Sequence, residues 1–125
     1  MKVKEIMNKS IVAESNIKGK DAVKIMAQHN IGSLVITNKD KIVGIVTERD
    51  ILKNINKLNE KISNIMSKNV ICIDENESID RAAFIMKEKK IKRLPVTRKN
   101  RLVGIITATD LIANAEELNE PFFFD

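Results

Sequence analysis

The sequence has 125 residues, of which 43% are hydrophobic and 31% charged, as in a soluble globular protein. The net charge is +5, but charges of both signs are interleaved along the chain, and Trp and Tyr are absent. Nucleic-acid binders instead cluster their basic residues and use aromatic side chains to stack on nucleobases. No apolar run reaches the roughly 20 residues of a membrane span and one cysteine cannot form an internal disulfide, so we expect a cytoplasmic protein without membrane or nucleic-acid partners.

Residues 1–60 predict a strand, a helix, two strands and a second helix. The apolar run "SIVA" is typical of a short strand, and "SLVITNKDKIVGIVT" of two strands joined by a polar turn. Apolar residues recur with helical spacing on either side of this hairpin. They are Ala22, Met26 and His29 in the first helix, and Ile51, Ile55 and Leu58 in the second.

Residues 61–118 predict the same order of elements again. "NVICI" is typical of a strand, "LPVTRKNRLVGIIT" of a hairpin, and Ser78 is placed to cap the helix between them. The helical stripes of this half are Ala82, Ile85 and Met86, and then Leu111, Ala115 and Leu118.

The two halves are copies of one unit. "IMNKSIV" at residues 6–12 matches "IMSKNVI" at residues 65–71 with an offset of 59, and residues 21–52 match residues 81–112 with an offset of 60. One residue was therefore gained or lost near residues 11–19. A unit of about 60 residues would be only marginally stable alone, because it buries too small a fraction of its surface. We predict an α/β fold in which unit 1–60 and unit 61–118 pack about a pseudo-two-fold axis, followed by a tail at 119–125.

Each hairpin runs through a glycine into a Thr-x-x-Asp string, "TERD" at residues 47–50 and "TATD" at residues 107–110. One interpretation is a capping box, in which Thr and Asp bind each other's backbone N–H groups at a helix start. A second is a ligand site, because such a junction offers N–H groups to phosphate, and hydroxyl and carboxylate oxygens to a sugar. The two interpretations are compatible, and the sequence leaves both open.

The strings "IGSLVI…KIVGIVTERDIL" and "IKRLPVTRKNRLVGIITATDLI", with the "IM-x-K-x-V/I" start of each unit, resemble CBS motifs. Residues 1 to about 118 resemble a tandem CBS pair, or Bateman module. The resemblance implies a regulatory sensor and not an enzyme. It implies an adenosine-type ligand (AMP, ADP or ATP, with S-adenosylmethionine or NADH as alternatives) in clefts between the units, no other cofactor, and transmission of occupancy to an unknown protein partner.

The resemblance also implies a set of ligand-binding residues. By position, Asp50 and Asp110 would hold the ribose hydroxyls, while Thr47 and Thr107 would contact ribose or phosphate. Arg49 and Thr109 would flank these residues, and the backbone near Val12 and Ile71 would read the adenine edge. The residues implied to pass beside the bases are Ile31, Gly32, Ser33, Ile91, Lys92 and Arg93.

The two copies differ where the ligand is expected. The first has Gly32 and Ser33 where the second has Lys92 and Arg93, so we expect two clefts of unequal affinity. Residues 87–101 carry eight basic side chains and one acidic one. This stretch is either a solvated helix end or a source of phosphate contacts.

Other features predict structural roles. His29 lies on an apolar stripe without metal-ligand spacing, and Cys72 lies in a strand-like run, so we expect a core or edge histidine and a buried thiol. The methionines of the two copies match in pairs and predict core positions. The helices after the two Thr-x-x-Asp strings predict a homodimer, and "PFFFD" predicts packing on this chain or a second copy. The rival to a sensor is a constitutive interaction module without a nucleotide.

Overall fold

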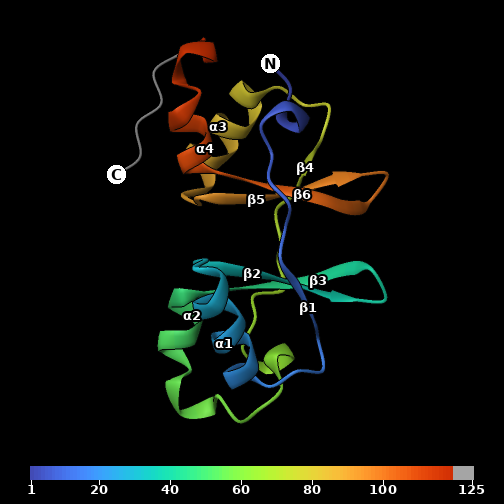
Figure 1. Ribbon diagram of the computed structural model, residues 1–125, viewed down its shortest axis with the longest axis vertical. Coiled ribbons are helices and arrows are strands. Elements are labelled where there is room, and N and C mark those ends of the chain that lie inside the picture. Colours follow the sequence, from blue (N-terminus) through green and yellow to red (C-terminus); the bar gives the residue numbers. More distant parts are fainter. Residues whose placement is uncertain (120–125) are drawn as a thin grey trace. The chain divides into compact units, whose positions relative to one another are not determined.

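The computed structural model describes residues 1–119 and separates them into two compact units (Figure 1). The first-repeat unit is Ile11–Val70, and the second-repeat unit is Met1–Ser10 with the residues from Ile71 onward. The segment that starts each sequence copy therefore packs with the other copy. Of the predicted tail 119–125, residues 120–125 and thus the "PFFFD" string lie outside the described residues.

The first-repeat unit contains a three-stranded sheet in the order β1-β2-β3, with β1 parallel and β3 antiparallel to β2. Its helices lie on one face of this sheet (Figure 1). The elements are β1 Val12–Glu14, α1 Gly19–His29, β2 Ser33–Asn38, β3 Lys41–Thr47, α2 Glu48–Lys53, and the 3₁₀ turns η2 Ile55–Lys57 and η3 Ile62–Asn64.

The second-repeat unit has the same topology, with the sheet order β4-β5-β6. Ser78 caps its first α-helix, since its hydroxyl accepts a hydrogen bond from the N–H of Arg81 at 3.1 Å, as predicted. The elements are η1 Val3–Glu5, β4 Ile73–Asp74, α3 Ile79–Lys89, β5 Arg93–Arg98, β6 Arg101–Thr107, α4 Ala108–Ala113 and η4 Ala115–Glu117. The α/β class and the repeated order of elements are confirmed.

Both polar turns are two-residue hairpin loops in the left-handed conformation. Lys39 and Asp40 have φ angles of 52° and 67°, and Lys99 and Asn100 have 50° and 66°. Two successive positive φ angles match the twist of the flanking strands, and Asp and Asn tolerate this region better than most residues.

The final helix of each unit is shorter than predicted. The backbone N–H and side-chain amide of Asn54 both donate to the carbonyl of Asp50, at 3.2 and 2.8 Å, and α2 ends there. Ile55 then begins a separate 3₁₀ turn and is 56% exposed. Asn114 ends α4 with the same side-chain contact to Asp110. The expected continuous helix through Leu58 is wrong, because a side-chain amide that binds the backbone competes with helix continuation.

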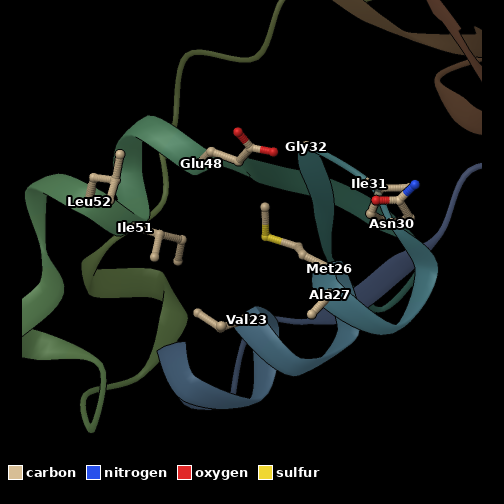
Figure 2. A pocket seen from close by; sticks show the side chains of 9 residues that line it. All are labelled: Val23, Met26, Ala27, Asn30, Ile31, Gly32, Glu48, Ile51 and Leu52. Atoms are coloured by element: carbon tan, nitrogen blue, oxygen red, sulfur yellow. The ribbon is translucent and has the colours of Figure 1, made fainter.

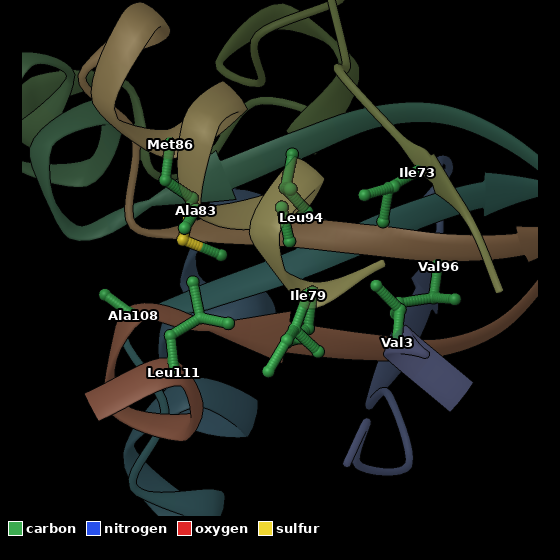
Figure 3. Packing of buried hydrophobic residues seen from close by; sticks show 11 residues of the cluster. Val3, Ile73, Ile79, Ala83, Met86, Leu94, Val96, Ala108 and Leu111 are labelled. Atoms are coloured by element: carbon green, nitrogen blue, oxygen red, sulfur yellow. The ribbon is translucent and has the colours of Figure 1, made fainter. Parts of the chain in front are cut away.

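Each unit has its own apolar core. In the second-repeat unit, side chains from α3, α4 and the sheet converge, and Val3 joins them from η1 (Figure 3). Its buried members are Val3, Ile73, Ile79, Ala82, Ala83, Met86, Leu94, Val96, Ile106, Ala108 and Leu111. Those of the first-repeat unit are Ala13, Ala22, Met26, Leu34, Ile36, Val46, Ile62 and Ile65. Met7 and Met66 pack against these cores, which supports the structural role predicted for the paired methionines.

His29 does not belong to the core. It is the last residue of α1 and is exposed, since the buried face of this helix consists of Gly19, Ala22 and Met26. The helical spacing correctly predicted that Ala22 and Met26 are buried. The last turn of α1 remains exposed, and His29 lies there.

The repeated glycines mark where another segment crosses the sheet. We call residues 6–12 and 65–71 the IM segments. The first pairs with β6 through reciprocal Asn8–Ile105 backbone hydrogen bonds of 2.8 Å, and the second pairs with β3 through Ser67 and Ile45 at 2.9 and 3.0 Å. A Cβ on Gly104 would lie 2.8 Å from the carbonyl oxygen of Asn8. Only glycine leaves room for the crossing backbone.

Candidate functional site

The Thr47–Asp50 pair is a capping box at the start of α2. The hydroxyl of Thr47 accepts a hydrogen bond from the N–H of Asp50 at 3.2 Å. In return, Oδ2 of Asp50 accepts from the N–H of Thr47 at 3.0 Å and from its hydroxyl at 3.1 Å. The capping interpretation is confirmed, and the arrangement holds one oxygen of the carboxylate fixed at the junction of β3 and α2.

The Thr107–Asp110 pair repeats this geometry at the junction of β6 and α4. The hydroxyl of Thr107 accepts from the N–H of Asp110 at 3.2 Å. Oδ2 of Asp110 accepts from the N–H and the hydroxyl of Thr107, at 2.8 and 3.0 Å. Each unit therefore presents one half-buried carboxylate, oriented by its own backbone, at the same place in the fold.

The IM segments add a partner that the sequence analysis missed. The side-chain amide of Asn8 donates to both oxygens of Asp110, at 2.9 and 3.0 Å. At the matching position, the hydroxyl of Ser67 lies 3.4 Å from Oδ1 of Asp50. The sequence signal for this partner was the glycine of each hairpin. A Cβ at that position would meet the IM segment that passes beside the strand carrying the Thr-x-x-Asp string.

Four of the predicted site residues lie beside the two capping boxes. Ser33 pairs with Thr47 across the β2–β3 ladder, and Arg93 pairs with Thr107 across β5–β6. The carbonyl of Gly32 accepts from the first N–H of α2 at 3.1 Å, and that of Lys92 accepts from the first N–H of α4 at 2.8 Å. Each unit thus places residues predicted to pass beside the base next to those predicted to bind ribose or phosphate.

The flanking residues lie close by in the chain but differ in exposure. Arg49 and Thr109 are exposed in the first turns of α2 and α4. Ile31 and Ile91 are half-buried, and each N–H donates at 3.0 Å to a methionine carbonyl at the end of the preceding helix.

Val12 and Ile71 occupy different structural positions. Val12 begins β1, pairs with Val35 and is 44% exposed, whereas Ile71 is half-buried and precedes β4. Ala13 pairs with Ile36 and Ile73 with Val96, so the strand register makes Cys72 the counterpart of Val12. Asn8 matches Ser67 in the same way, so the additional residue of the second copy lies between Ser67 and Cys72.

Cys72 is only half-buried, unlike the buried thiol that the sequence predicted. Partial burial raises the pKa of its thiol, because desolvation disfavours the thiolate. A protonated thiol is a poor nucleophile at neutral pH, which agrees with a structural role.

A mostly apolar cavity of about 410 Å³ lies between α1 and α2 in the first-repeat unit. Met26 and Val23 of α1 and Ile51 of α2 point toward it (Figure 2). Only Ile31 and Gly32 are shared with the predicted ligand set. The lining residues are Val23, Met26, Ala27, Asn30, Ile31, Gly32, Glu48, Ile51 and Leu52.

A cavity of similar volume lies along α3 in the second-repeat unit. The Arg81 guanidinium lies 5.4 Å from the ring centroid of Phe84, which is 54% exposed. None of the predicted ligand residues lines it. Its lining residues are Ser78, Asp80, Arg81, Ala83, Phe84, Lys87 and Asn119.

The basic stretch at residues 87–101 divides into separate roles. Lys87 and Lys89 lie in the last turn of α3, where cations complement the helix dipole. Arg98 forms an ion pair with Glu75, whose side chain is largely buried. The pKa of the Glu75 carboxyl is lowered, mainly because the guanidinium of Arg98 donates hydrogen bonds to it. Only Lys92 and Arg93 lie beside a capping box.

Membrane-spanning helices and metal clusters are both absent from the part of the chain that the structure describes. Within residues 1–119, no helix is long and apolar enough to cross a membrane. The same residues contain no group of three or more His, Cys, Asp or Glu side chains that could hold a metal ion.

Comparison with known proteins decides the family. The family model described as CBS domain matches residues 3–57 and again residues 62–117. The chain belongs to the CBS domain family. Two matches in tandem make it a CBS pair, as the repeated strings indicated.

One curated relative of this CBS pair is the L-aspartate semialdehyde sulfurtransferase of Methanocaldococcus jannaschii, with 40% identity over 112 residues. The match covers 87% of this chain but 22% of the relative, so this chain spans only about a fifth of that enzyme's length.

Solved CBS pairs have the same fold. The CBS domain pair of protein MJ0100, in complex with 5-methylthioadenosine and S-adenosyl-L-methionine, matches with a TM-score of 0.86 and 38% identity, covering 93% of this chain and 96% of that one. The CBS domain protein PAE2072 from Pyrobaculum aerophilum, complexed with AMP, matches with a TM-score of 0.83 and 23% identity, covering 89% and 90%. At that identity the second likeness concerns the fold alone.

Proposed function

We propose that this CBS pair is a regulatory module that binds an adenosine-type nucleotide, with Asp50 and Asp110 as acceptors for the ribose hydroxyls. The observation that carries the proposal is the repeated geometry of these two carboxylates. In each, the adjacent threonine binds Oδ2 through its N–H and hydroxyl. The likeness to a CBS pair holding two adenosine compounds supports the ligand class.

The chemistry suits a vicinal diol. An ionised carboxylate has about four lone-pair positions on its two oxygens, and it only accepts hydrogen bonds. Threonine occupies two of them on Oδ2 in each unit and none on Oδ1, so Oδ1 is the oxygen that threonine leaves to other donors. The two neighbouring hydroxyls of ribose are such donors, and 2′-deoxy-AMP should bind more weakly than AMP.

The ligand's phosphate is proposed to lie near Lys92 and Arg93, the basic residues beside the Thr107–Asp110 box. Arg93 pairs with Thr107, and the Lys92 carbonyl receives the first N–H of α4. We therefore propose AMP, ADP or ATP as the physiological ligand, with S-adenosylmethionine or NADH as alternatives. At low salt, ATP should bind more tightly than adenosine, and added salt should reduce this advantage. Equal affinities at low salt would contradict a phosphate role for these two side chains.

Occupancy is proposed to be passed to a partner protein, and the module itself to form a homodimer. Leu52 of α2 and Ile112 of α4 occupy the same repeat position and are 73% and 57% exposed. Two exposed apolar side chains on matched helices favour burial against another chain, since large apolar side chains gain free energy when they leave water. A second copy presents the same self-complementary surface.

The experiment that tests the ligand class uses the purified protein directly. Denaturation should release a bound nucleotide that mass spectrometry identifies, and the stripped, refolded protein should bind one of AMP, ATP, S-adenosylmethionine or NADH by calorimetry. Asp50→Asn and Asp110→Asn should each weaken one class of sites by about tenfold or more, equivalent to 1.4 kcal/mol. Absence of binding by all four compounds would favour the rival function, a constitutive interaction module.

A further inference from the structure

The two carboxylates have different neighbours at one repeat position. Asn8 and Ser67 are equivalent residues of the two IM segments, because their backbones pair with Ile105 and Ile45, the equivalent residues of β6 and β3. Asparagine offers two amide hydrogens, whereas serine offers one hydroxyl hydrogen and two acceptor lone pairs. The repeat therefore differs at a side chain that contacts the proposed ribose acceptor.

Hydrogen-bond lengths show what the difference does. Among the described residues, Asp110 accepts hydrogen bonds from the N–H and hydroxyl of Thr107 and from the side-chain amide of Asn8, at donor–acceptor distances between 2.8 and 3.0 Å. The one amide nitrogen of Asn8 lies within 3.0 Å of both carboxylate oxygens. Asp50 accepts two from Thr47 at 3.0 and 3.1 Å, and its only other described contact is with Ser67 at 3.4 Å. That distance is beyond the usual range for a hydroxyl donor.

We propose that Asn8 is a specificity-determining residue that lowers the affinity of the Asp110 site for the ribose of a nucleotide. The inference rests on the proposed ribose-binding function. A ribose diol at Asp110 must first displace the amide of Asn8 from both carboxylate oxygens. At Asp50 it replaces only the long contact with Ser67. Only the Asp110 site therefore contains an internal competitor for the ribose hydroxyls.

The displacement leaves the surrounding fold intact. Asn8 is exposed, so its amide can turn toward water. Its backbone remains paired with Ile105 through two hydrogen bonds of 2.8 Å, and Met7 remains packed against the core of the second-repeat unit. Only the side chain of Asn8 has to move, so its substitution should change affinity without unfolding the unit.

The test is calorimetry with AMP on the stripped full-length protein. The wild-type chain should show two classes of sites, and Asp50→Asn and Asp110→Asn should each weaken one of them, which assigns each class to a carboxylate. Asn8→Ser should tighten the Asp110 class by about tenfold and leave the Asp50 class unchanged. The reverse change, Ser67→Asn, should weaken the Asp50 class by a similar factor. Both shifts correspond to a single competing charge-assisted contact.

Two controls separate competition from a general structural effect. Asn76→Ser makes the same exchange at an exposed residue just after β4 and should change neither class. The end of β4 pairs with Thr97 near the hairpin turn, at the other end of the sheet from Thr107. With 2′-deoxy-AMP, the gain from Asn8→Ser should shrink, because the released acceptor serves the ribose hydroxyls.

The outcomes distinguish the inference from the function beneath it. Two classes of AMP sites that do not move in Asn8→Ser would overturn the role of Asn8 and leave the proposed function in place. Weakening of both classes in Asn8→Ser would also overturn it, since a damaged unit, and not a removed competitor, would then explain the change. No AMP binding to the wild-type chain would overturn both for this ligand.

Discussion

The two aspartates should contribute unequally to stability when no nucleotide is present. Asp50→Asn keeps a carbonyl oxygen for Thr47, and the new amide can donate to the hydroxyl of Ser67, which accepts as readily as it donates. The change removes mainly the interaction of a charge with the start of α2, which is worth about 0.3–1 kcal/mol. We expect Asp50→Asn to lower the free energy of unfolding by about 1 kcal/mol or less.

Asp110→Asn should cost more, because its second partner is Asn8. The amide of Asn8 donates to both carboxylate oxygens in the wild-type chain, and it must turn over to accept from a new amide. A charge-assisted contact worth about 1.5–3 kcal/mol is thereby replaced by a neutral hydrogen bond worth about 1 kcal/mol. The expected loss is about 1 kcal/mol larger than in Asp50→Asn.

Urea unfolding of the stripped protein, followed by circular dichroism, measures both values. Asp40→Asn is a suitable control, because Asp40 is exposed in a hairpin turn with φ at 67°, a conformation that asparagine tolerates. Its unfolding midpoint should match that of the wild-type chain. Equal losses in Asp50→Asn and Asp110→Asn would refute the contribution assigned to Asn8, and no loss in either would refute the capping contribution.

Three further predictions concern packing, pH and assembly. Gly104→Ala should lower the free energy of unfolding by about 1–3 kcal/mol in urea, because the new methyl group meets the backbone of the IM segment; a loss under about 0.5 kcal/mol would contradict this packing. Arg98 lowers the folded-state pKa of Glu75, so this pair stabilises the fold above pH about 4.3, the unfolded value, and the contribution disappears as pH falls through the folded pKa. Glu75→Gln should flatten that acid-side slope in thermal melts, and an unchanged slope would show that the pair does not supply it. Light scattering should show a dimer for the wild-type chain and for the control Gln28→Glu, but a monomer for Leu52→Glu. A wild-type monomer at high micromolar concentration would refute the proposed dimer.

Features that depend on neighbouring residues were predicted from the sequence. The hairpins, the Ser78 cap and the two Thr-x-x-Asp capping boxes each involve partners within a few residues, so the local string contains all the chemistry that forms them. The repeat added the α/β class and the family, because a pattern that occurs twice over more than 30 residues restricts the fold more than any single motif. The cap and the proposed ligand site share the Thr and Asp of each string, so the same local sequence predicts both, and the structure confirms the cap.

The tertiary structure decided which distant residues complete each site. Asn8 lies 102 positions before Asp110, and only the pairing of an IM segment with β6 brings the two together. The hydrogen bond from Asn54 to the carbonyl of Asp50 decided where α2 ends, and tertiary packing decided that His29 is exposed. Helical spacing predicts neither, because it does not show where a helix ends or which of its turns are buried. Side-chain periodicity shows which face of an element is apolar, whereas the crossing of two backbones at Gly104 is a packing event between segments far apart in the chain.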